Sequence, residues 1–572
     1  MSKTWQRSGN GLLYLIIITL FSSALELLGF GLIMPIINIS VDEVASENKL
    51  SLYIKNVLDF LNIDPKLSSL LMVITIIFVL KSFFVFLAGI VEIWICTEFK
   101  RKNQIQIIKL LENVNYSYHL SDSSGYNLNL VSKEVDRYMS TLRNISSILI
   151  SFISIVIFLG SLLIIDFLIV IYMATLGFLF FFIFKPIFKL TVKYSIETSE
   201  SSTKLQRSLV ELIFNFSYLK ATNRTEKTKN HINLSIENLI KITRNMGVFS
   251  NIMTVFKEPV GIIILAILIF IKVEIQGDNI SEVLVIGIIL YRTVQRLLDF
   301  QHGWQRMNEA VGGLFVVEEA IKKLSENKEE DFGNQKFDSS KKIEFKNVFF
   351  NFENNITLKD LSFSIQPNKV LGITGPSGSG KSTIVNLITK LLVPTKGKIL
   401  SGNVDFKNIN NKFLRDKIGY VTQNAFLLDG TLEENISFWD MKKKSKQKIR
   451  QIISDSGLEG LTKRLNENIT EAGKNLSGGQ KQRITIAREL FRKPELIIFD
   501  EPTSALDNNL EKKFKSTIRK LKNKHTIIII SHNLSILDIC DDIIVLEKGR
   551  LVQKGSFKNL KKKVGLFKDL IN

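Results

Sequence analysis

The sequence predicts two domains of different classes: an α-helical domain with six membrane spans, followed by an α/β domain built around a glycine-rich loop. The chain has 572 residues, a net charge of +20 and a mean hydropathy of +0.16. Residues 1–340 carry 33 Lys and Arg against 31 Asp and Glu, a net of +2, whereas residues 341–572 carry 42 against 24, a net of +18. This split excludes one soluble globule and a mostly disordered chain. We predict a membrane domain at 1–325, a linker at 326–340 and the second domain at 341–572.

Six apolar runs approach the length of about 20 residues that a membrane-spanning helix needs. Most contain at most one charged residue, and the last two contain more. Only Asp166 separates the third run from the fourth, which predicts a tight helical hairpin. The predicted spans are Leu12–Ile39, Leu67–Val91, Ile145–Ile165, Phe167–Phe184, Val248–Ile271 and Ser281–Leu298.

The orientation follows from the number of spans and from the basic residues beside them. The first run is too long for the core of a cleavable signal peptide, so we expect it to remain as a span. An even number of spans places both ends on one side, together with the long connections Glu92–Asn144 and Lys185–Gly247. Basic residues flank these connections, as the positive-inside rule requires for the cytoplasmic side. They are Lys100, Arg101, Lys102, Lys185 and Lys189.

The connection on the opposite side contains an amphipathic segment, Leu50–Leu61. Its apolar residues recur at helical spacing on one face. Two interpretations stay open: a short helix packed on its own domain, or an interfacial helix that meets lipid or a lipid-like substrate.

Three basic residues, Lys81, Arg292 and Arg296, lie inside predicted spans. Charged side chains are expensive there and usually face a partner or a cavity. Arg292 and Arg296 are four residues apart, so they share one helical face. They either snorkel or pair with acidic residues in the spans (Glu26, Glu258 or Glu282), or they line a basic cavity for an anionic headgroup.

The glycine-rich loop in the second domain matches the pattern G-x-x-x-x-G-K-[ST] completely. It follows an apolar run, Val370–Thr374, and precedes a helical pattern, Ile384–Leu392, which is the strand–loop–helix context that the pattern requires. Its residues are Gly375, Pro376, Ser377, Gly378, Ser379, Gly380, Lys381, Ser382 and Thr383. Backbone N–H groups at such a helix start surround phosphate oxygens, Lys381 neutralises them and Ser382 ligates Mg²⁺. The loop therefore predicts a nucleotide site.

A second apolar strand, Leu496–Asp500, ends in a carboxylate and is followed by Glu501. We expect Asp500 to belong to the Mg²⁺ shell and Glu501 to polarise an attacking water.

Between these two motifs, the residues Leu476 to Gln480 read Leu-Ser-Gly-Gly-Gln, which resembles the signature of ATP-binding cassette (ABC) proteins. Other motifs of that family occur in the same order along the chain. The resemblance implies an adenine-stacking aromatic at Phe352 and a Mg²⁺-binding, γ-phosphate-sensing glutamine at Gln423. It further implies an exporter-type loop at Glu471, a D-loop that ends at Asp507 and a switch histidine at His532.

The resemblance extends to the six spans, which are similar to the membrane domain of ABC exporters. It implies a half-transporter that binds ATP and Mg²⁺ and works as a homodimer. Lys381 and Glu501 of one chain would meet the signature residues Ser477, Gly478, Gly479 and Gln480 of the other. His119–Gly125 and Phe214–Ala221 are the candidate regions for coupling helices that dock on the ATP-binding domains.

The membrane residues resemble those of bacterial flippases for lipid-linked oligosaccharides, including the protein-glycosylation flippase. The resemblance rests on the basic span residues, on Leu50–Leu61 and on Glu26 with Leu32–Pro35. In that group, basic residues in spans two and six line the cavity and meet a pyrophosphate, and the matching positions are Lys81 and Arg292, with Arg296 nearby. This implies an amphiphilic, anionic cargo, contact with membrane lipids and a place in the bacterial inner (cytoplasmic) membrane. Only about eleven residues precede the first span, so the family's elbow helix is expected to be short or missing.

Two other functions remain alternatives. The first is export of a peptide, a bacteriocin or a hydrophobic small molecule by the same motor, although we see no N-terminal Cys/His peptidase domain. The second is a non-transporting regulator or channel, against which the intact Glu501 and His532 argue. We expect no nucleic-acid partner, because no motif beyond the basic charge supports one.

Overall fold

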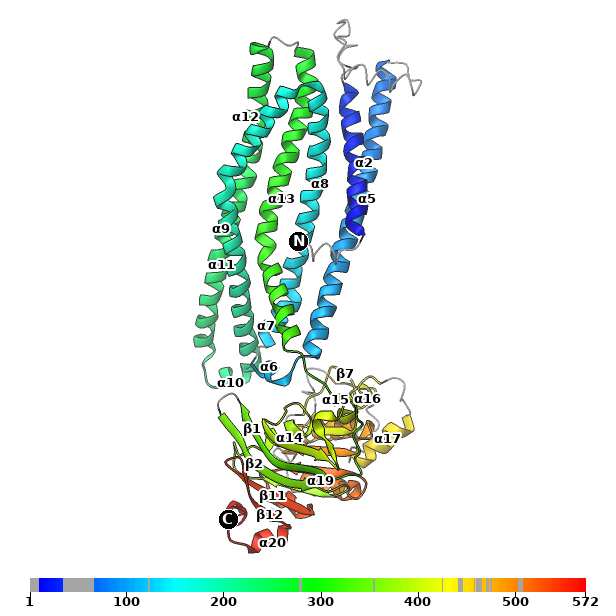
Figure 1. The fold of residues 1–572 in the computed structure, drawn as a ribbon, viewed down its shortest axis with the longest axis vertical. Coiled ribbons are helices and arrows are strands. Elements are labelled where there is room, and N and C mark those ends of the chain that lie inside the picture. Colours follow the sequence, from blue (N-terminus) through cyan, green and yellow to red (C-terminus); the bar gives the residue numbers. More distant parts are fainter. Residues whose placement is uncertain are drawn as a thin grey trace. The chain divides into compact units, whose positions relative to one another are not determined.

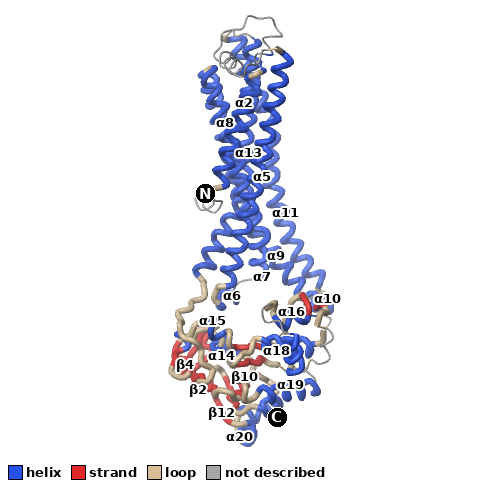
Figure 2. Tube along the Cα trace, turned by 90° about the vertical axis from the view of Figure 1, so that its right-hand side faces the viewer, coloured by secondary structure: helices blue, strands red, loops and turns tan. Residues whose placement is uncertain are grey.

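The structure is a computed structural model, shown in Figure 1. It describes residues 10–33, 36, 66–121, 124–276, 280–352, 355–423, 425–440, 446–456, 458, 465–469, 473, 476–502 and 508–571. The chain divides into two compact units, Met1–Val114 with Tyr118–Lys328, and Asn115–Ser117 with Glu329–Asn572. Long helices make up the first unit, and the strands of the described residues lie in the second (Figure 2).

The first unit, called the membrane unit below, consists of long helices with short helices between them. The long helices are α2 (Gly11–Gly31), α5 (Leu67–Glu112), α8 (Val135–Ile165), α9 (Phe167–Phe214), α11 (Thr225–Val255), α12 (Lys257–Phe270) and α13 (Ile280–Glu326). The short elements are α6 (Tyr116–Ser121), α7 (Ser124–Asn129), α10 (Phe216–Ala221) and two π-helical turns, Leu130–Glu134 and Ile271–Ile275.

Each predicted span falls on helical structure in the described residues. Within the described residues, three helical stretches are long and apolar enough to cross a membrane: Gly11–Gly31, Leu67–Glu112 and Ser124–Ile164. The predicted hairpin at Asp166 is confirmed, because α8 ends at Ile165 and α9 begins at Phe167. Asp166 caps α9 by accepting a hydrogen bond from the Leu168 N–H (2.8 Å), and it also forms an ion pair with Lys272. The end of the first span and the segment Leu50–Leu61 lie outside the described residues.

One predicted span is divided in the structure. The fifth span, predicted as continuous over Val248–Ile271, is interrupted at Phe256 between α11 and α12. Pro259 lies in the first turn of α12, where its missing N–H has no intrahelical partner to lose, so a new helix start accommodates it. Of the predicted coupling regions, His119–Gly125 contains described residues of α6 and α7, and Phe214–Ala221 contains α10.

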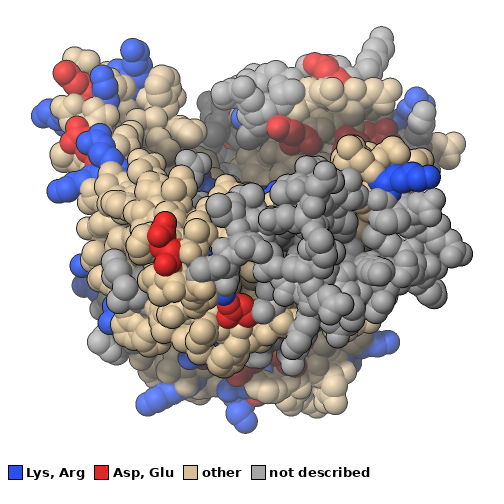
Figure 3. Space-filling model, turned by 90° about the horizontal axis from the view of Figure 1, so that it is seen from above, with Lys and Arg blue, Asp and Glu red and all other residues tan. Residues whose placement is uncertain are grey.

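The long helices bury one side and expose large apolar side chains on the other. On α5, Met72, Val79, Phe86 and Trp94 are each more than half exposed. An apolar surface of this extent is typical of contact with lipid. In the view from above, uncharged residues make up most of the described part of that face (Figure 3). On the inner side, α13 packs against α8 and α9, and α2 packs against α5.

The described residues of the second unit, called the nucleotide unit below, form two larger sheets and a two-stranded one. The antiparallel sheet has the order β2-β1-β4-β5, and the main sheet has the order β12-β11-β3-β10-β9-β6, parallel except for β12. The strands are β1 (Ile343–Phe352), β2 (Asn355–Ile365), β3 (Val370–Thr374), β4 (Lys396–Ser401), β5 (Val404–Asp405), β6 (Ile418–Val421), β7 (Gly430–Thr431), β8 (Asn468–Ile469), β9 (Leu496–Asp500), β10 (Thr526–Ile530), β11 (Asp542–Glu547) and β12 (Arg550–Gly555).

Helices cover the main sheet and form a small helical subdomain beside it. The helices are α14 (Lys381–Ile388), α15 (Asn411–Arg415), α16 (Leu432–Ser437), α17 (Lys446–Asp455), α18 (Gly478–Phe491), α19 (Asn508–Leu521), α20 (Phe557–Lys562) and α21 (Leu566–Ile571). The parallel strands β3, β9 and β10 are almost entirely apolar and buried, as expected for a sheet covered on both faces. A separate apolar cluster joins α16, α17 and α18.

Candidate functional site

The candidate site lies at the carboxyl ends of adjacent parallel strands in the nucleotide unit. The loop 375–380 follows β3, Asp500 ends β9, His532 lies two residues after β10, and Gln423 lies two residues after β6. Because β6, β9, β10 and β3 are neighbours in that order, their ends meet at one edge of the sheet. Ligands of open α/β sheets bind at this edge.

The loop after β3 has a backbone that only glycine adopts easily. Gly375 has φ +148°, and a Cβ at that position would come within 2.2 Å of the Leu546 carbonyl oxygen. Gly380 has φ +100° and caps α14, which therefore begins at Lys381 and not at Ile384 as the apolar pattern predicted. The loop thus ends on the N-terminus of a helix, where backbone N–H groups attract anions.

The same loop fits phosphate groups. Within the described residues, the Ser379 hydroxyl oxygen is buried and has no hydrogen-bond partner. Around Gly378, the space that a Cβ would enter is open to at least 4 Å. A buried hydroxyl without a partner is costly, and a phosphate oxygen would satisfy it. The loop residues therefore suit the nucleotide phosphates that the sequence predicts.

Lys381 lies at the centre of the loop. Its Nζ donates to the carbonyl oxygens of Gly375 (3.0 Å) and Pro376 (2.9 Å), and the side chain is buried. Burial lowers the pKa of Lys381, and the carboxylates of Glu501 and Asp500 oppose that shift. Ser382, the next residue of α14, is exposed and free to reach a metal ion.

Asp500 meets a residue that the sequence analysis missed. Its Oδ2 accepts a hydrogen bond from the Tyr420 hydroxyl (3.1 Å) on β6. Burial raises the pKa of Asp500, and this hydrogen bond acts in the opposite direction. A tyrosine inside a short apolar strand has no motif around it, so only the strand order β10-β9-β6 could have revealed this contact. Tyr420 is thus positioned to orient the carboxylate that the sequence predicts to bind Mg²⁺.

Replacement of Tyr420 by Phe is expected to weaken Mg²⁺ binding by roughly tenfold, because second-shell partners orient the metal ligands. The measurement is the Mg²⁺ concentration that gives half-maximal nucleotide hydrolysis. Tyr14→Phe serves as the control, because Tyr14 is exposed on α2. An unchanged Mg²⁺ dependence in Tyr420→Phe would show that the hydroxyl does not support Asp500.

Three residues predicted to be catalytic are in direct contact. The Glu501 carboxylate accepts a hydrogen bond from Gln423 Nε2 at 2.7 Å, and its other oxygen lies 3.0 Å from His532 Nε2. Glu501 has φ +49°, and its N–H donates to the Ile530 carbonyl at 2.9 Å. This strained backbone fixes the carboxylate between β9 and β10. The structure therefore brings together residues from three separate motifs, and their roles remain predictions.

The signature residues start helix α18. Ser477 Oγ accepts from the Gln480 N–H (3.2 Å), and the Gln480 side chain accepts from the Ser477 N–H (2.9 Å), which forms a capping box. Ser477 and Gly478 are exposed, and the space beside Gly478 is open. Gly479 is buried in the first turn. The capped helix start is thus accessible to an anion from outside the chain.

Arg488, which no sequence motif indicated, connects this helix to the loop after Gln423 by hydrogen bonds. It is buried on α18 and donates to the carbonyl oxygens of Asn435 (2.8 Å) and Phe426 (3.1 Å). Its guanidinium also lies 4.8 Å from the centre of the Phe426 ring. The loop is therefore attached to the helix that carries the signature residues.

Of the remaining residues predicted to bind nucleotide, the structure describes only Phe352. Phe352 ends β1, is partly buried and packs edge-on against Phe350 with 5.3 Å between ring centres. Asp507, the rest of its motif and Glu471 lie outside the described residues.

In the membrane unit, the three predicted basic residues converge on Glu26. This carboxylate on α2 is 1% exposed and meets Lys81 of α5 at 3.1 Å and Arg296 of α13 at 2.9 Å, with Arg292 at 3.9 Å. The structure therefore shows the predicted pairing with Glu26, and the cavity for an anionic headgroup stays a prediction. The side chains of Glu258 and Glu282 are not described.

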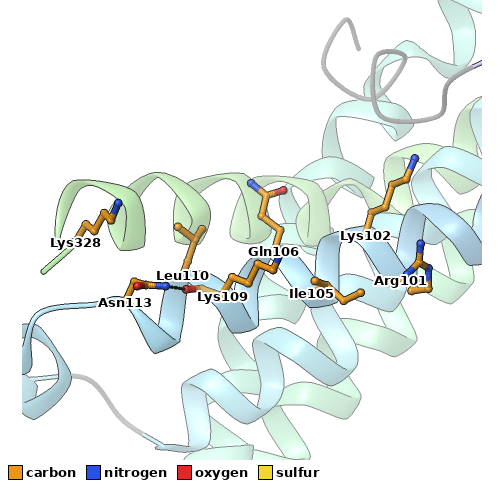
Figure 4. Close-up of a pocket in the computed structure, with 8 residues that line it drawn as sticks. All are labelled: Arg101, Lys102, Ile105, Gln106, Lys109, Leu110, Asn113 and Lys328. Carbon is orange, nitrogen blue, oxygen red and sulfur yellow. Dashed lines mark hydrogen bonds between the residues drawn. The ribbon is translucent and has the colours of Figure 1, made fainter. Parts of the chain in front are cut away.

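A separate basic groove lies along the lower part of α5 (Figure 4). Its basic residues are Arg101, Lys102, Lys109 and Lys328, around the apolar Ile105 and Leu110. Glu98 pairs with Arg101 at 2.7 Å and is 4.0 Å from Lys102. Arg101 and Lys102 are among the residues that predicted a cytoplasmic side, so the groove extends that basic surface down α5.

Comparison with known families supports both parts of this description. The family described as "ABC transporter transmembrane region" matches residues 11–291, and the family described as "ABC transporter" matches residues 358–504. Together the two matches cover well over half of the chain.

Individual relatives match over a shorter range. A lactococcin-G-processing and transport ATP-binding protein of Lactococcus lactis is 40% identical over 206 residues, which is 35% of this chain and 29% of the relative. An ATP-dependent lipid A-core flippase of Colwellia psychrerythraea is 38% identical over 204 residues, or 35% of each chain. The chain thus spans about a third of the length of these curated relatives.

The fold of the whole chain matches a solved structure. A bacterial Atm1-family ABC exporter with ATP bound superimposes with a TM-score of 0.82, 20% identity and coverage of 99% of both chains. At this identity, the likeness establishes the fold, a helical membrane domain followed by a nucleotide-binding domain.

Proposed function

The chain belongs to the ABC transporter family, and from this premise we propose that it hydrolyses ATP to export or flip an amphiphilic molecule across a bacterial inner membrane. The observation that carries the ATPase part is the contact of Glu501 with Gln423 and His532 beside the phosphate-binding loop. The Glu501 carboxylate is the general base, because it is fixed at the sheet edge and faces two groups able to sense a γ-phosphate.

Mg²⁺, when bound with ATP, neutralises the charge that develops on the phosphates. Ser382, Asp500 and Gln423 are the residues that would hold it, since oxygen atoms are the ligands that Mg²⁺ prefers. Lys381, in the first turn of α14, would neutralise the phosphates, and the Gln423 amide would sense them at the start of the loop to which Arg488 is hydrogen-bonded.

We propose that the working unit is a homodimer. The support is that the capped helix start at Ser477 is exposed. Such a helix start suits a phosphate that is bound by the glycine-rich loop of another chain. In a two-fold symmetric pair, each signature helix would complete the site of the other chain. Closure around ATP and reopening after hydrolysis would then drive the membrane helices.

For the cargo, we propose a lipid-linked oligosaccharide or a related anionic lipid. The support is the group of three cations around Glu26 in the membrane unit, since a surplus of positive charge in a span attracts an anionic group. Among the relatives, one is named as a lipid A-core flippase, and the relative from Lactococcus lactis is named for the processing and transport of lactococcin G. Export of a peptide is therefore the alternative outcome of the transport test.

The test is a transport assay in proteoliposomes with a fluorescent lipid-linked oligosaccharide. Replacement of both Arg292 and Arg296 by Ala is expected to reduce cargo-stimulated ATP hydrolysis about tenfold or more, because each charge-assisted hydrogen bond contributes about 1.5–3 kcal/mol. Basal hydrolysis should survive. Lys322→Ala, an exposed cation near the end of the same helix, is the control. Unchanged transport in the double variant would rule out a basic cargo site at these residues.

A further inference from the structure

The charged cluster around Glu26 carries an inference that rests on the proposed function and deepens it. We propose that Glu26 is a built-in counter-anion that competes with the anionic group of the cargo for Lys81, Arg292 and Arg296. Glu26 then sets the charge that the cargo must carry, and it acts as a specificity-determining residue of the cargo site.

The geometry makes Glu26 the common partner of all three cations. Its Oε1 lies 3.1 Å from Lys81 Nζ and 3.9 Å from Arg292 Nε. Its Oε2 accepts a hydrogen bond from Arg296 Nη2 at 2.9 Å. The cluster therefore joins α2 to α5 and α13 through one carboxylate.

Among the described residues, the charges in the cluster do not balance. Three cations face the buried carboxylate of Glu26 and the partly exposed carboxylate of Asp299, which lies 4.0 Å from Arg296 on α13. One positive charge is therefore in excess. One turn before Glu26, α2 contacts α8 through an uncharged hydrogen bond of 2.8 Å between Ser23 and Ser154. Since unbalanced charge is costly at membrane depth, the cluster suits an anionic group.

The cations are reachable although Glu26 is not. The side chain of Glu26 is 1% exposed, whereas those of Lys81, Arg296 and Arg292 are 17%, 26% and 42% exposed. Arg292 is also the most weakly held of the three, and its guanidinium lies 5.0 Å from the centre of the Phe30 ring. An anion can thus reach Arg292 first. When it then contacts Lys81 or Arg296, it replaces Glu26 as their partner.

Competition and simple bracing by Glu26 predict opposite effects of the same substitution. If Glu26 competes, Glu26→Gln removes a rival anion and strengthens binding of anionic amphiphiles. If Glu26 only braces the helices, the cations lose their anchor and binding weakens. The gain under competition should be larger for a diphosphate than for a monophosphate, because the Coulomb attraction grows with ligand charge.

The experiment measures the Kd of dodecyl diphosphate and dodecyl monophosphate for the full chain in nanodiscs. Glu26→Gln is expected to lower the Kd of the diphosphate about tenfold and that of the monophosphate less. Glu274→Gln, at an exposed glutamate of the same unit, should change neither. Glu26→Asp keeps the charge on a shorter side chain and should fall between the wild type and Glu26→Gln, which preserves the test if Glu26→Gln does not fold. An unchanged or higher Kd of the diphosphate in the folded variants would overturn the proposal.

The double variant Arg292→Ala with Arg296→Ala separates this inference from the proposed function. If the double variant loses diphosphate binding while Glu26→Gln binds the diphosphate no more tightly than the wild type, the proposed cargo site is supported and the proposed role of Glu26 is refuted. If the wild type binds neither amphiphile, or the double variant binds both as the wild type does, the proposed anionic cargo and the role of Glu26 fall together.

Discussion

Glu501→Gln is expected to bind ATP with unchanged affinity and to hydrolyse it about 10² to 10⁴ times more slowly than the wild type, as expected for loss of a general base. The amide has nearly the same shape as the carboxylate and can still contact Gln423 and His532, which lie at 2.7 Å and 3.0 Å. It cannot take a proton from water. The measurements are steady-state phosphate release and equilibrium binding of a fluorescent ATP analogue.

The matched control for this substitution is Glu495→Gln. Glu495 directly precedes β9 and pairs with Lys417, whereas Glu501 follows the other end of the strand. The control should hydrolyse ATP at the wild-type rate. Hydrolysis by Glu501→Gln within a few-fold of the wild-type rate would contradict the assignment of Glu501 as the base.

Lys381→Ala is expected to lose ATP binding itself. The Lys381 ammonium is hydrogen-bonded to the loop carbonyl oxygens of Gly375 and Pro376, so its charge lies inside the loop that is predicted to bind the phosphates. Loss of one partner from a buried charge pair costs about 2–5 kcal/mol, which is roughly 30-fold or more in Kd. Isothermal titration with ATP measures the loss directly.

Lys369→Ala provides the control for the lysine substitution. Lys369 is exposed and directly precedes β3, at the end of the strand opposite to the phosphate-binding loop. Its removal should leave the ATP affinity unchanged. Equal ATP affinity in Lys381→Ala and in the wild type would mean that the loop does not hold the phosphates in the expected way.

The nucleotide site was largely predictable because local sequence determines its parts. Residues 370–374 and 496–500 form strands with the predicted bounds, since short buried apolar runs followed by a glycine loop or a carboxylate leave few alternatives. The contact of Glu501 with Gln423 and His532 follows from the parallel order of β6, β9 and β10. Tyr420 was not predictable, because its role depends on that order and on no local pattern.

The membrane unit was predictable in its helices and less so in its contacts. Apolar length alone locates the spans, but it does not show where α11 ends or that Lys272 pairs with Asp166. The convergence of Lys81, Arg292 and Arg296 on Glu26 joins residues up to 270 positions apart. The hydropathy pattern shows that charged residues inside the spans are unusual. Only the packing of α2, α5 and α13 shows that Glu26 is the partner of these cations.

The most direct measurement compares transport by the wild type and Glu501→Gln in matched proteoliposomes that contain a fluorescent lipid-linked oligosaccharide. An impermeant quencher added outside reports the side on which the label lies. With ATP and Mg²⁺, the wild type should move the label across the bilayer, whereas Glu501→Gln should not, and neither should act without ATP. Equal movement by the two proteins, or movement by the wild type that does not depend on ATP, would contradict ATP-driven transport of this cargo.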